Sequence, residues 1–590
     1  MSELKQIYNT RIELKKTELS DVKKRLKAIS LLRLSLFLAA FCAIYLSKNN
    51  IQQVLIILGF STLLFVFLIS VYNQLKSKKK YLEAYITENT NEINALKGVF
   101  TPFQNGQHYF EDEHAFSLDI DLFGSQSFFH QLNRTKTSIG EEKLASYLNS
   151  NDINGVEIKQ KIIQEFSDNL DWRQHFQVTA SLTDKSFHPK TLVSWMTSYQ
   201  PVLSKKLKLL PYIISALSLI VITLNAFDVI STKTLMLYFF IGLTISGAYF
   251  KRITTIYTSA SKAKDMLSSY SKLLDLIEKS NFNTPGIKDE FSSIQNEHAS
   301  PSVSLKKLTV IIERMGQRNN LLLAPISNGF MLTDIKYALK MEDWIEKNKL
   351  LISKWFETIA FTDAYLSFAN YNFNHPLHTC PIIENDKKST LNAANLRHPL
   401  INIEVSIPNS IQINTTDFII ITGANMAGKS TFLRTVALNL VMANCGLKVA
   451  AKSFLYRPLK LISSMRTSDS LLNDESYFFS ELKRLKHIVT QLEQDEYFII
   501  LDEILKGTNS KDKAEGSALF VERLINSNAT GLIATHDLSL CTLSTKFTQI
   551  KNHYFDAEII NNELFFDYTF KNGICQNMNA SFLLKKMEII

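Results

Sequence analysis

The stretch DFIIITGANMAGKSTFLR, residues 417–434, decides the fold of the C-terminal part of this chain. A short apolar run, 418–421, leads into Gly423, and the spacing G-x-x-x-x-G-K-S then ends at Ser430. An apolar segment with a helical pattern, 432–442, follows. Strand, glycine loop and helix in this order let backbone N–H groups and a helix N-terminus surround phosphate oxygens. The stretch therefore predicts a phosphate-binding loop.

The residues of this loop have separate expected roles. Lys429 is expected to reach the β- and γ-phosphates of ATP, and the Ser430 hydroxyl is expected to coordinate Mg²⁺. The predicted cofactors are therefore ATP and Mg²⁺. The remaining residues expected to bind the nucleotide are Gly423, Asn425, Met426, Ala427, Gly428 and Thr431.

Two further apolar runs complete the expected site. Residues 497–501 are typical of a buried parallel strand and end in Asp502 and Glu503. Asp502 is expected to hold the Mg²⁺ shell, and Glu503 to orient and deprotonate the attacking water. Residues 531–535 end in His536, which is expected either to contact the γ-phosphate as a third catalytic residue or to be structural. These strand ends predict a site at the carboxyl edge of an open α/β sheet.

Here the sequence resembles the MutS family of mismatch-repair ATPases. GANMAGKST is similar to the family loop GPNMGGKST, FIILDEILKGTNSKDKAEGSAL to its Walker B segment, and ATHDLSL to its A-T-H-x-x-E-L motif. SMRTSDSLLNDESYFFSELKRL is similar to the family signature, with Ser476 on the signature serine and Glu481 on the family's glutamate. The resemblance implies a homodimer in which Ser476 contacts the partner's nucleotide. Asp474 stands where the family usually has Gly, and a carboxylate near a γ-phosphate disfavours that contact.

A second resemblance lies further upstream. LDIDLFG followed by NRTKTSIGEEKLASYL, within residues 118–148, is similar to the start of the MutS core domain. Thr137 is expected to cap a helix there. Arg397 and His398, in a segment similar to the family's R-H-P-x motif, are expected either to contact nucleotide or to be structural. Apolar spacing predicts further helices, with a loop or linker at 281–301; the helices are expected at 260–277, 305–314, 331–347 and 350–371.

Four apolar stretches form two pairs. Residues 34–46 and 54–72 make the first pair, and residues 209–227 and 235–250 the second, with a short loop inside each pair. Each pair has the pattern of a membrane hairpin. Lys and Arg flank both pairs, so the positive-inside rule predicts soluble domains in the cytoplasm and a multi-pass protein of the plasma (inner) membrane. The lipid bilayer is thus an expected partner; four buried helices of a large helical core are the alternative.

The amino-acid composition restricts the fold classes, metal sites and partners to be considered. Gly and Pro number only 18 and 12 among 590 residues, which disfavours a loop-rich or β-sandwich protein. The five cysteines show no C-x-x-C spacing, which argues against a metal site built on cysteine and favours a reducing compartment. The net charge of +9 fits nucleic acid, anionic lipid or membrane topology, and does not choose among them.

The expected fold is an α/β P-loop (ABC-type) ATPase domain, a mostly α-helical core and lever domain, and two transmembrane helical hairpins. The basic segment at the start is expected to be a solvated helix face or an arm that binds lipid or nucleic acid. The expected domains are a basic helical segment (1–29), the first hairpin (30–72), the first part of a MutS-like core (73–204), the second hairpin (205–252), the second part of the core with the lever (253–385) and a MutS-like ATPase domain (386–590).

The expected function follows from these parts. A membrane-tethered MutS-like protein is expected to bind and hydrolyse ATP and to bind DNA, in mismatch repair or recombination, through ATP-driven dimer closure. The family's mismatch reader uses a Phe-x-Glu motif, and apolar wedges of this kind kink DNA. Tyr109-Phe110-Glu111 has Tyr in the wedge position and lies just before the core, so its similarity to the motif is attributed to chance. The alternative function is a membrane-associated ABC-class ATPase motor without DNA binding.

Overall fold

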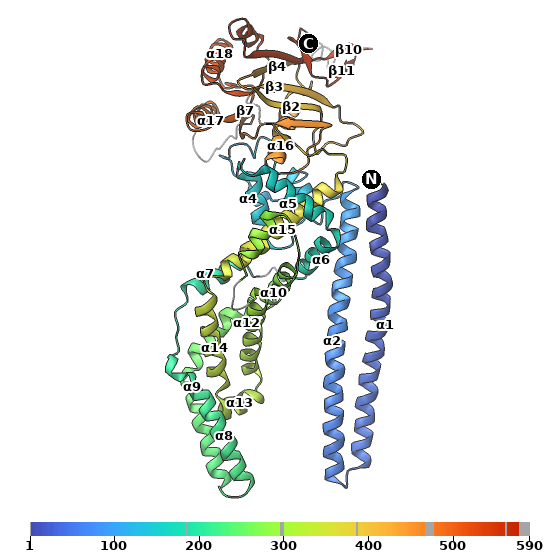
Figure 1. Ribbon diagram of the computed structural model, residues 1–590, viewed down its shortest axis with the longest axis vertical. Helices are drawn as coiled ribbons and strands as arrows, with labels where there is room; N and C mark the ends of the chain where they lie inside the picture. Colours follow the sequence, from blue (N-terminus) through green and yellow to red (C-terminus); the bar gives the residue numbers. More distant parts are fainter. Residues whose placement is uncertain are drawn as a thin grey trace.

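The computed structural model describes residues 2–183, 187–295, 300–384, 388–466, 477–560 and 563–576. Asp474 and Ser476, the signature-segment residues expected to lie near a partner's nucleotide, are outside these ranges. Figure 1 shows an α/β domain at one end of an elongated molecule, a helical body beside it, and two helical hairpins that extend in the same direction away from the α/β domain.

The first hairpin consists of α1 (Ser2–Leu46) and α2 (Ile51–Ala95), each 45 residues long. The expected boundaries at residues 29 and 72 therefore fall inside continuous helices. The polar half of α1 has one exposed face, where Lys15 and Lys78 both pair with Glu18, at 3.0 and 2.7 Å, and one buried face that includes Tyr8. In the apolar half the Arg33 guanidinium lies 5.2 Å from the centroid of the Tyr72 ring.

The second hairpin consists of α8 (Leu210–Ala226) and α9 (Thr232–Ser261). A short helix, α13 (Leu323–Met331), packs against both. Sequence patterns predict the hairpin but not α13. Among the described residues, α1, α2, α9 and the stretch Lys205–Ala226, which includes α8, are long and apolar enough to cross a membrane by length and composition.

The helical body joins the hairpins to the α/β domain. The expected cap of α4 is confirmed, because the Thr137 side chain accepts a hydrogen bond from Gly140 N at 3.0 Å. The expected loop at 281–301 is wrong in part, since it contains α11, whose Ile287 and Phe291 are buried. The body contains α3 (Phe128–Leu132), α4 (Ser138–Asn149), α5 (Val156–Asp168), α6 (Leu170–Ser181), α7 (Pro189–Ser198), α10 (Lys264–Glu278), α11 (Pro285–Ser292), α12 (Pro301–Gly316), α14 (Thr333–Asn348), α15 (Ile352–Asn374) and the short 3₁₀ helices η1 (Gln107–Tyr109), η2 (Lys205–Lys208) and η3 (Gln317–Asn319).

A six-stranded sheet forms the centre of the α/β domain, in the order β12-β9-β4-β8-β7-β6. Adjacent strands in this sheet are parallel, except that β12 pairs with β9 in the antiparallel direction. β4 and β8 are buried along their whole length, as expected for parallel strands covered on both faces. The strands are β4 (Phe418–Gly423), β6 (Lys460–Ser464), β7 (Tyr497–Asp502), β8 (Thr530–Ala534), β9 (Ile550–Phe555) and β12 (Lys571–Asn572); the helices are α16 (Lys429–Asn444), α17 (Tyr477–Leu492), α18 (Ser510–Asn526) and the 3₁₀ helix η4 (Leu538–Thr545).

A second sheet, not predicted from the sequence, completes this domain in the order β1-β5-β2-β3. Asn409 of β3 accepts from Phe570 N at 2.8 Å and donates to the Tyr568 carbonyl at 3.0 Å. These bonds fix the segment before β12 beside the glycine loop. The strands are β1 (Ile382–Ile383), β2 (Ser389–Leu396), β3 (Asn409–Asn414) and β5 (Ser453–Tyr456); β10 (Glu558–Ile560) and β11 (Glu563–Phe565) form a separate hairpin.

The helical body and the α/β domain share a polar interface. The buried carboxylate of Asp119 accepts from Ser463 Oγ at 2.6 Å and from Arg466 N at 2.8 Å. On the other side, Asn372 near the end of α15 accepts from Lys448 N at 3.0 Å. The sheet that carries the candidate site is therefore fixed to the helices that lead to the hairpins.

Candidate nucleotide site

The glycine loop connects β4 to α16 in the expected order. Gly423, Met426 and Gly428 have positive φ angles of 150°, 68° and 103°. A Cβ atom at Gly423 would lie 2.5 Å from the Phe555 carbonyl oxygen, so only glycine fits there. The loop arches over the start of α16, where free N–H groups and the helix dipole favour an anion.

Lys429 places a buried cation inside this arch. Its side-chain Nζ donates to the carbonyl oxygens of Gly423 and Ala424, at 2.8 and 3.0 Å. Only 5% of Lys429 is exposed, and this burial lowers its pKa, which the nearby Glu503 opposes. A buried ammonium with neutral partners is best balanced by an anionic group, so the arrangement suits a phosphate.

Ser430 and Asp502 lie together, although they are 72 positions apart. The Ser430 hydroxyl hydrogen-bonds to the Asp502 carboxylate, which opposes the rise in pKa that burial causes at Asp502. A hydroxyl and a carboxylate are oxygen ligands of the kind that Mg²⁺ prefers. Among the described residues there is no cluster of three or more His, Cys, Asp or Glu suited to a metal. These two residues therefore fit a Mg²⁺ site in which phosphate oxygens and water supply the remaining ligands.

Glu503 and His536 join the ends of β7 and β8. Glu503 Oε1 lies 2.7 Å from His536 Nε2, and this hydrogen bond, with the nearby cations, lowers the pKa of Glu503 to about 2. Glu503 N donates to the Ala534 carbonyl at 2.9 Å. His536 Nε2 in turn lies 3.3 Å from Lys429 Nζ. The three predicted strand ends thus meet, and Lys429, His536 and Glu503 form one chain of contacts.

Glu481, which corresponds to the glutamate of the family signature, holds the turn that follows β7. Only 3% of Glu481 is exposed, and its carboxylate accepts from Leu505 N at 2.5 Å and from Lys506 N at 3.1 Å. The turn held in this way directly follows Glu503, and Glu503 and Leu505 both have positive φ angles, of 50° and 58°. Glu481 therefore positions a strained turn that carries the candidate base.

A pocket of about 430 Å³ opens beside the loop. His398 lines it, and burial together with the nearby Arg434 lowers the pKa of His398 to about 4, so the imidazole is neutral at pH 7. Arg397 instead donates to the carbonyl oxygens of Ile403 and Ser406, which is a structural role. Of the predicted residues, Asn425, Met426, Gly428, Lys429, Ser430, Thr431 and Glu503 line the pocket.

Other predicted residues lie away from the pocket wall. Gly423 and Ala427 support the loop from behind, and Ala427 is fully buried. Sequence reasoning missed Phe555 and Tyr568, which line the pocket from β9 and from the segment before β12. Tyr568 would lie 3.1 Å from a Cβ atom at Gly428. No local sequence pattern predicts that Phe555 and Tyr568 line the pocket, because their positions depend on contacts between segments that are distant in the sequence.

These features define a class of protein: an α/β domain with a phosphate-type glycine loop, an acidic strand end and a histidine at one edge of a parallel sheet. Residues 419–586 match the family model described as MutS domain V. This match, together with the relatives described next, supports a MutS-family protein, and the names of those relatives include DNA mismatch repair proteins.

Three relatives show how far the similarity extends. The chain is 29% identical over 247 residues to MutS protein homolog 4 of Homo sapiens, covering 40% of this chain and 25% of the relative. It is 29% identical over 253 residues to DNA mismatch repair protein MutS of Staphylococcus haemolyticus, covering 41% and 28%. The chain is 25% identical over 300 residues to the protein of the same name from Staphylococcus aureus, strain JH9, covering 48% of this chain and 33% of the relative. The matches thus span a quarter to a third of these relatives.

Proposed function

We propose that this chain binds and hydrolyses ATP at the pocket beside the glycine loop. One observation carries the proposal: the buried cation of Lys429, the Ser430–Asp502 pair and the Glu503–His536 pair converge at one sheet edge. In this assignment Lys429 balances the β- and γ-phosphates. Ser430 and Asp502 would hold Mg²⁺, which neutralises phosphate charge when it is bound.

Glu503 is the proposed water-positioning group. Its pKa of about 2 keeps it ionised at neutral pH, but so low a value also makes it a weak base. We infer that Glu503 mainly orients the attacking water by accepting a hydrogen bond. His536 contacts both Glu503 and Lys429, so it is placed to keep the carboxylate and the ammonium at a fixed separation.

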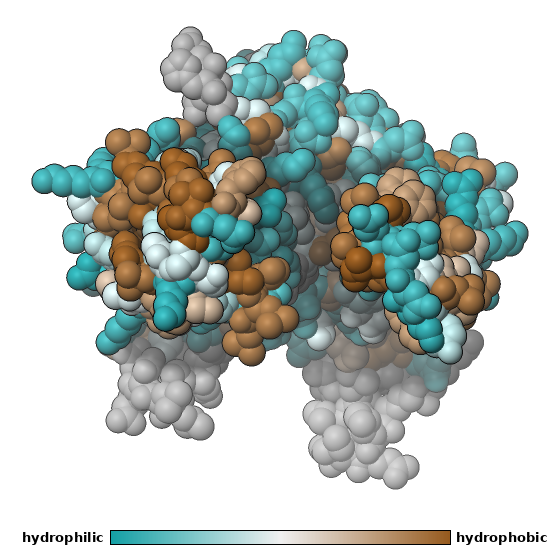
Figure 2. Space-filling view, turned by 90° about the horizontal axis from the view of Figure 1, so that it is seen from below, coloured by the Kyte–Doolittle hydropathy of each residue, from teal (hydrophilic) through white to brown (hydrophobic). Residues whose placement is uncertain are grey.

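Membrane tethering is part of the same proposal. Large apolar side chains such as Leu55, Phe60 and Leu219 are exposed along both hairpins, at 60%, 69% and 70%. Figure 2, which looks at the ends of the hairpins, has brown apolar surface on each of them. Because both hairpins extend in the same direction (Figure 1), one bilayer can hold both. The chain is accordingly proposed to lie in the plasma (inner) membrane with its soluble domains in the cytoplasm; release from membranes by carbonate would contradict this.

Dimer closure is the proposed output of ATP binding. The signature segment would supply Ser476 to the nucleotide of a second copy, completing a composite site. Tethering of both copies in one membrane plane would raise their effective concentration. Asp474, which replaces the usual glycine near that serine, is expected to weaken closure through repulsion of the γ-phosphate.

DNA is the proposed partner because the family is related to mismatch repair. Filter binding of the purified cytoplasmic part to duplex, mismatched and branched DNA, at several salt concentrations, tests this proposal. Contacts to phosphates predict an affinity that falls steeply with salt. Equal, weak retention at all salt concentrations would argue against DNA.

The second candidate, a membrane ATPase motor without DNA binding, is favoured by a specific feature of the fold. The helices α12 and α14 extend away from the α/β domain and meet the apolar hairpin α8–α9 (Figure 1). The resemblance to the MutS family implies lever helices that lead to a DNA clamp in this region, whereas here α12 and α14 lead to a hairpin with exposed apolar side chains. ATP hydrolysis that is stimulated by lipid vesicles and insensitive to DNA would support this candidate.

A further inference from the structure

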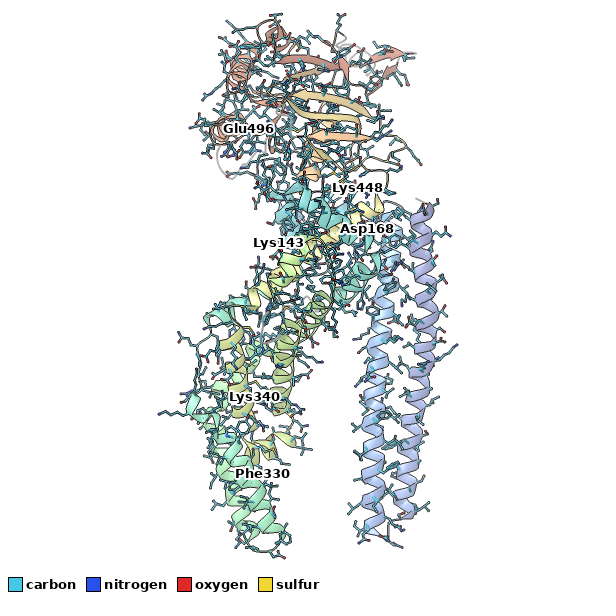
Figure 3. All side chains as sticks on the ribbon, in the orientation of Figure 1. Lys143, Asp168, Phe330, Lys340, Lys448 and Glu496 are labelled. Atoms are coloured by element: carbon cyan, nitrogen blue, oxygen red, sulfur yellow. The ribbon has the colours of Figure 1, made fainter. Side chains whose placement is uncertain are left out.

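The short helix α13 is embedded in the second hairpin at the depth of its apolar segments. Ser218 of α8 donates to the Phe330 carbonyl at 2.5 Å, and the Phe330 ring lies 5.3 Å from that of Phe239 on α9. A Cβ atom at Gly242 would lie 1.9 Å from the Gly329 carbonyl oxygen, so the two helices meet backbone to backbone. Figure 3 labels Phe330 within this hairpin, well below Lys340 of α14.

The contacts set the depth of α13. Ser218 is eight residues before the end of α8 at Ala226, and Gly242 is ten residues after the start of α9 at Thr232. At a rise of 1.5 Å per residue, these positions lie about 12 and about 15 Å from the hairpin tip. A hydrocarbon layer is about 30 Å thick, so the C-terminal end of α13 lies near its middle.

The outward side of this segment is apolar. Leu321 and Leu322, just before α13, are 90% and 80% exposed. Within α13 the exposed large side chains are Leu323, Ile326 and Met331. The helices α8 and α9, against which α13 packs, also expose apolar side chains. Large apolar side chains gathered on one surface are unfavourable in water and mark an interaction site. The exposed hairpin residues include Leu219, Ile220, Met236, Leu237, Phe240 and Ile241.

The inward side of the segment carries buried polar groups beside the Phe330 ring. Asn328 Oδ1 accepts from Asp334 N at 2.9 Å. The Arg318 guanidinium pairs with the Asp334 carboxylate at 3.5 Å and donates to Thr254 Oγ1 at 3.0 Å, and the two charged side chains are only 5% and 10% exposed. Polar groups turned inward and apolar groups turned outward are the arrangement expected of protein that faces lipid.

The non-helical backbone before α13 is also partly provided with partners. Asn320 Oδ1 accepts from both Leu322 N and Leu323 N, at 3.0 and 3.1 Å. Such local hydrogen bonds are needed within a membrane, where no water is present to pair with backbone N–H and C=O groups. The chain thus descends after α12, turns, and returns as α14 on the side from which it entered.

We propose that residues 317–332 are a third membrane-inserted element, a re-entrant segment whose exposed apolar face is covered by lipid acyl chains. The proposal rests on the membrane tethering proposed above and extends it to a segment too short to span. Lipid is favoured over a second protein copy because α13 packs against α8 and α9 at the depth of Ser218 and Gly242, and all three helices expose apolar side chains.

The test uses the full chain in liposomes, with an environment-sensitive fluorophore on single introduced cysteines. The test position is Leu322→Cys. Leu219→Cys on α8 is the control for the spanning hairpin, and Leu350→Cys, 81% exposed after α14, is the control for water. The exposed native Cys42 and Cys380 are replaced by Ser in all three proteins. Quenching by phospholipids with a doxyl group on the acyl chain reports lipid contact.

The proposal predicts blue-shifted emission at position 322 and quenching within about twofold of that at position 219. Emission at 322 like that at 350, with position 219 still quenched, would overturn the re-entrant segment and leave the tether standing. Emission typical of water at both 322 and 219 would overturn the tether as well. Blue-shifted emission at 322 without doxyl quenching would show that protein, and not lipid, covers this face, and would also contradict the proposal.

Discussion

Replacing Glu481 by Gln should slow ATP hydrolysis much more than it weakens ATP binding. The Glu481 carboxylate accepts from both Leu505 N and Lys506 N and so holds the turn after Glu503. Glutamine has the same shape but a single acceptor oxygen, and its NH₂ group would face one of the two N–H donors. One hydrogen bond to a charged group is lost, which is worth about 1.5–3 kcal/mol. If that free energy is lost from the positioning of Glu503 in the transition state, kcat decreases by roughly 10- to 150-fold.

The assay compares the steady-state kcat with the affinity for a fluorescent ATP analogue, using the full-length protein. Glu493→Gln, which makes the same chemical change at an exposed residue just after α17, is the matched control and should leave both quantities unchanged. Wild-type kcat in Glu481→Gln would refute the positioning role. A parallel loss of nucleotide affinity and folding would show that Glu481 only stabilises the domain.

Further predictions concern the site, the topology and the assembly. Glu503→Gln should bind ATP but hydrolyse it at least about 100-fold more slowly, and loss of binding would show that Glu503 is structural. The pKa of Glu503 is about 2 in the folded protein, which is below its unfolded value of about 4.3. The ionised carboxylate should therefore stabilise the folded state above about pH 4.3, and this stabilisation should be lost as the pH falls through 2. Urea unfolding should show that the destabilisation caused by Glu503→Gln disappears near pH 2. A reporter at Lys48 should be outside the cell and one at Asn281 inside, and the reverse labelling would refute the topology. A mixture of Lys429→Ala and Ser476→Arg subunits should recover about one working site per heterodimer, whereas associated but inactive subunits would exclude a composite site.

The glycine loop and the strand ends were predictable because their signals are local. The spacing from Gly423 to Ser430 predicts strand, loop and helix, and β4 and α16 have that order. The carboxyl ends of parallel strands meet at one edge, so the proximity of Asp502 and His536 to the loop also followed from sequence.

Other features depend on contacts between distant segments. Glu481 reaches Leu505 across 24 positions, and Tyr568 is placed beside the loop by bonds to Asn409. The helix α11 lies within a polar stretch, and the burial of Ile287 and Phe291 against the helical body stabilises it there.

The hairpins show both outcomes. Their apolar stretches were visible in the sequence, but the polar half of α1 continues the same helix and docks through Tyr8, whose hydroxyl donates to Asn374 at 2.8 Å. The segment around α13 gave no signal of membrane depth, because nine residues are too few to span. The depth proposed for it rests on the hydrogen bond from Ser218 to Phe330 and on the close contact between Gly242 and Gly329.

The central claim is that ATP is hydrolysed beside the glycine loop, and one comparison tests it most directly. ATP turnover is measured for the full-length chain in lipid vesicles, as wild type, as Lys429→Ala and as Lys452→Ala, an exposed lysine on the same domain. Because Lys429 balances phosphate charge directly, its replacement should reduce turnover by at least about 100-fold, while Lys452→Ala should behave as wild type. Turnover in Lys429→Ala equal to that of the wild type would contradict the assignment of this site.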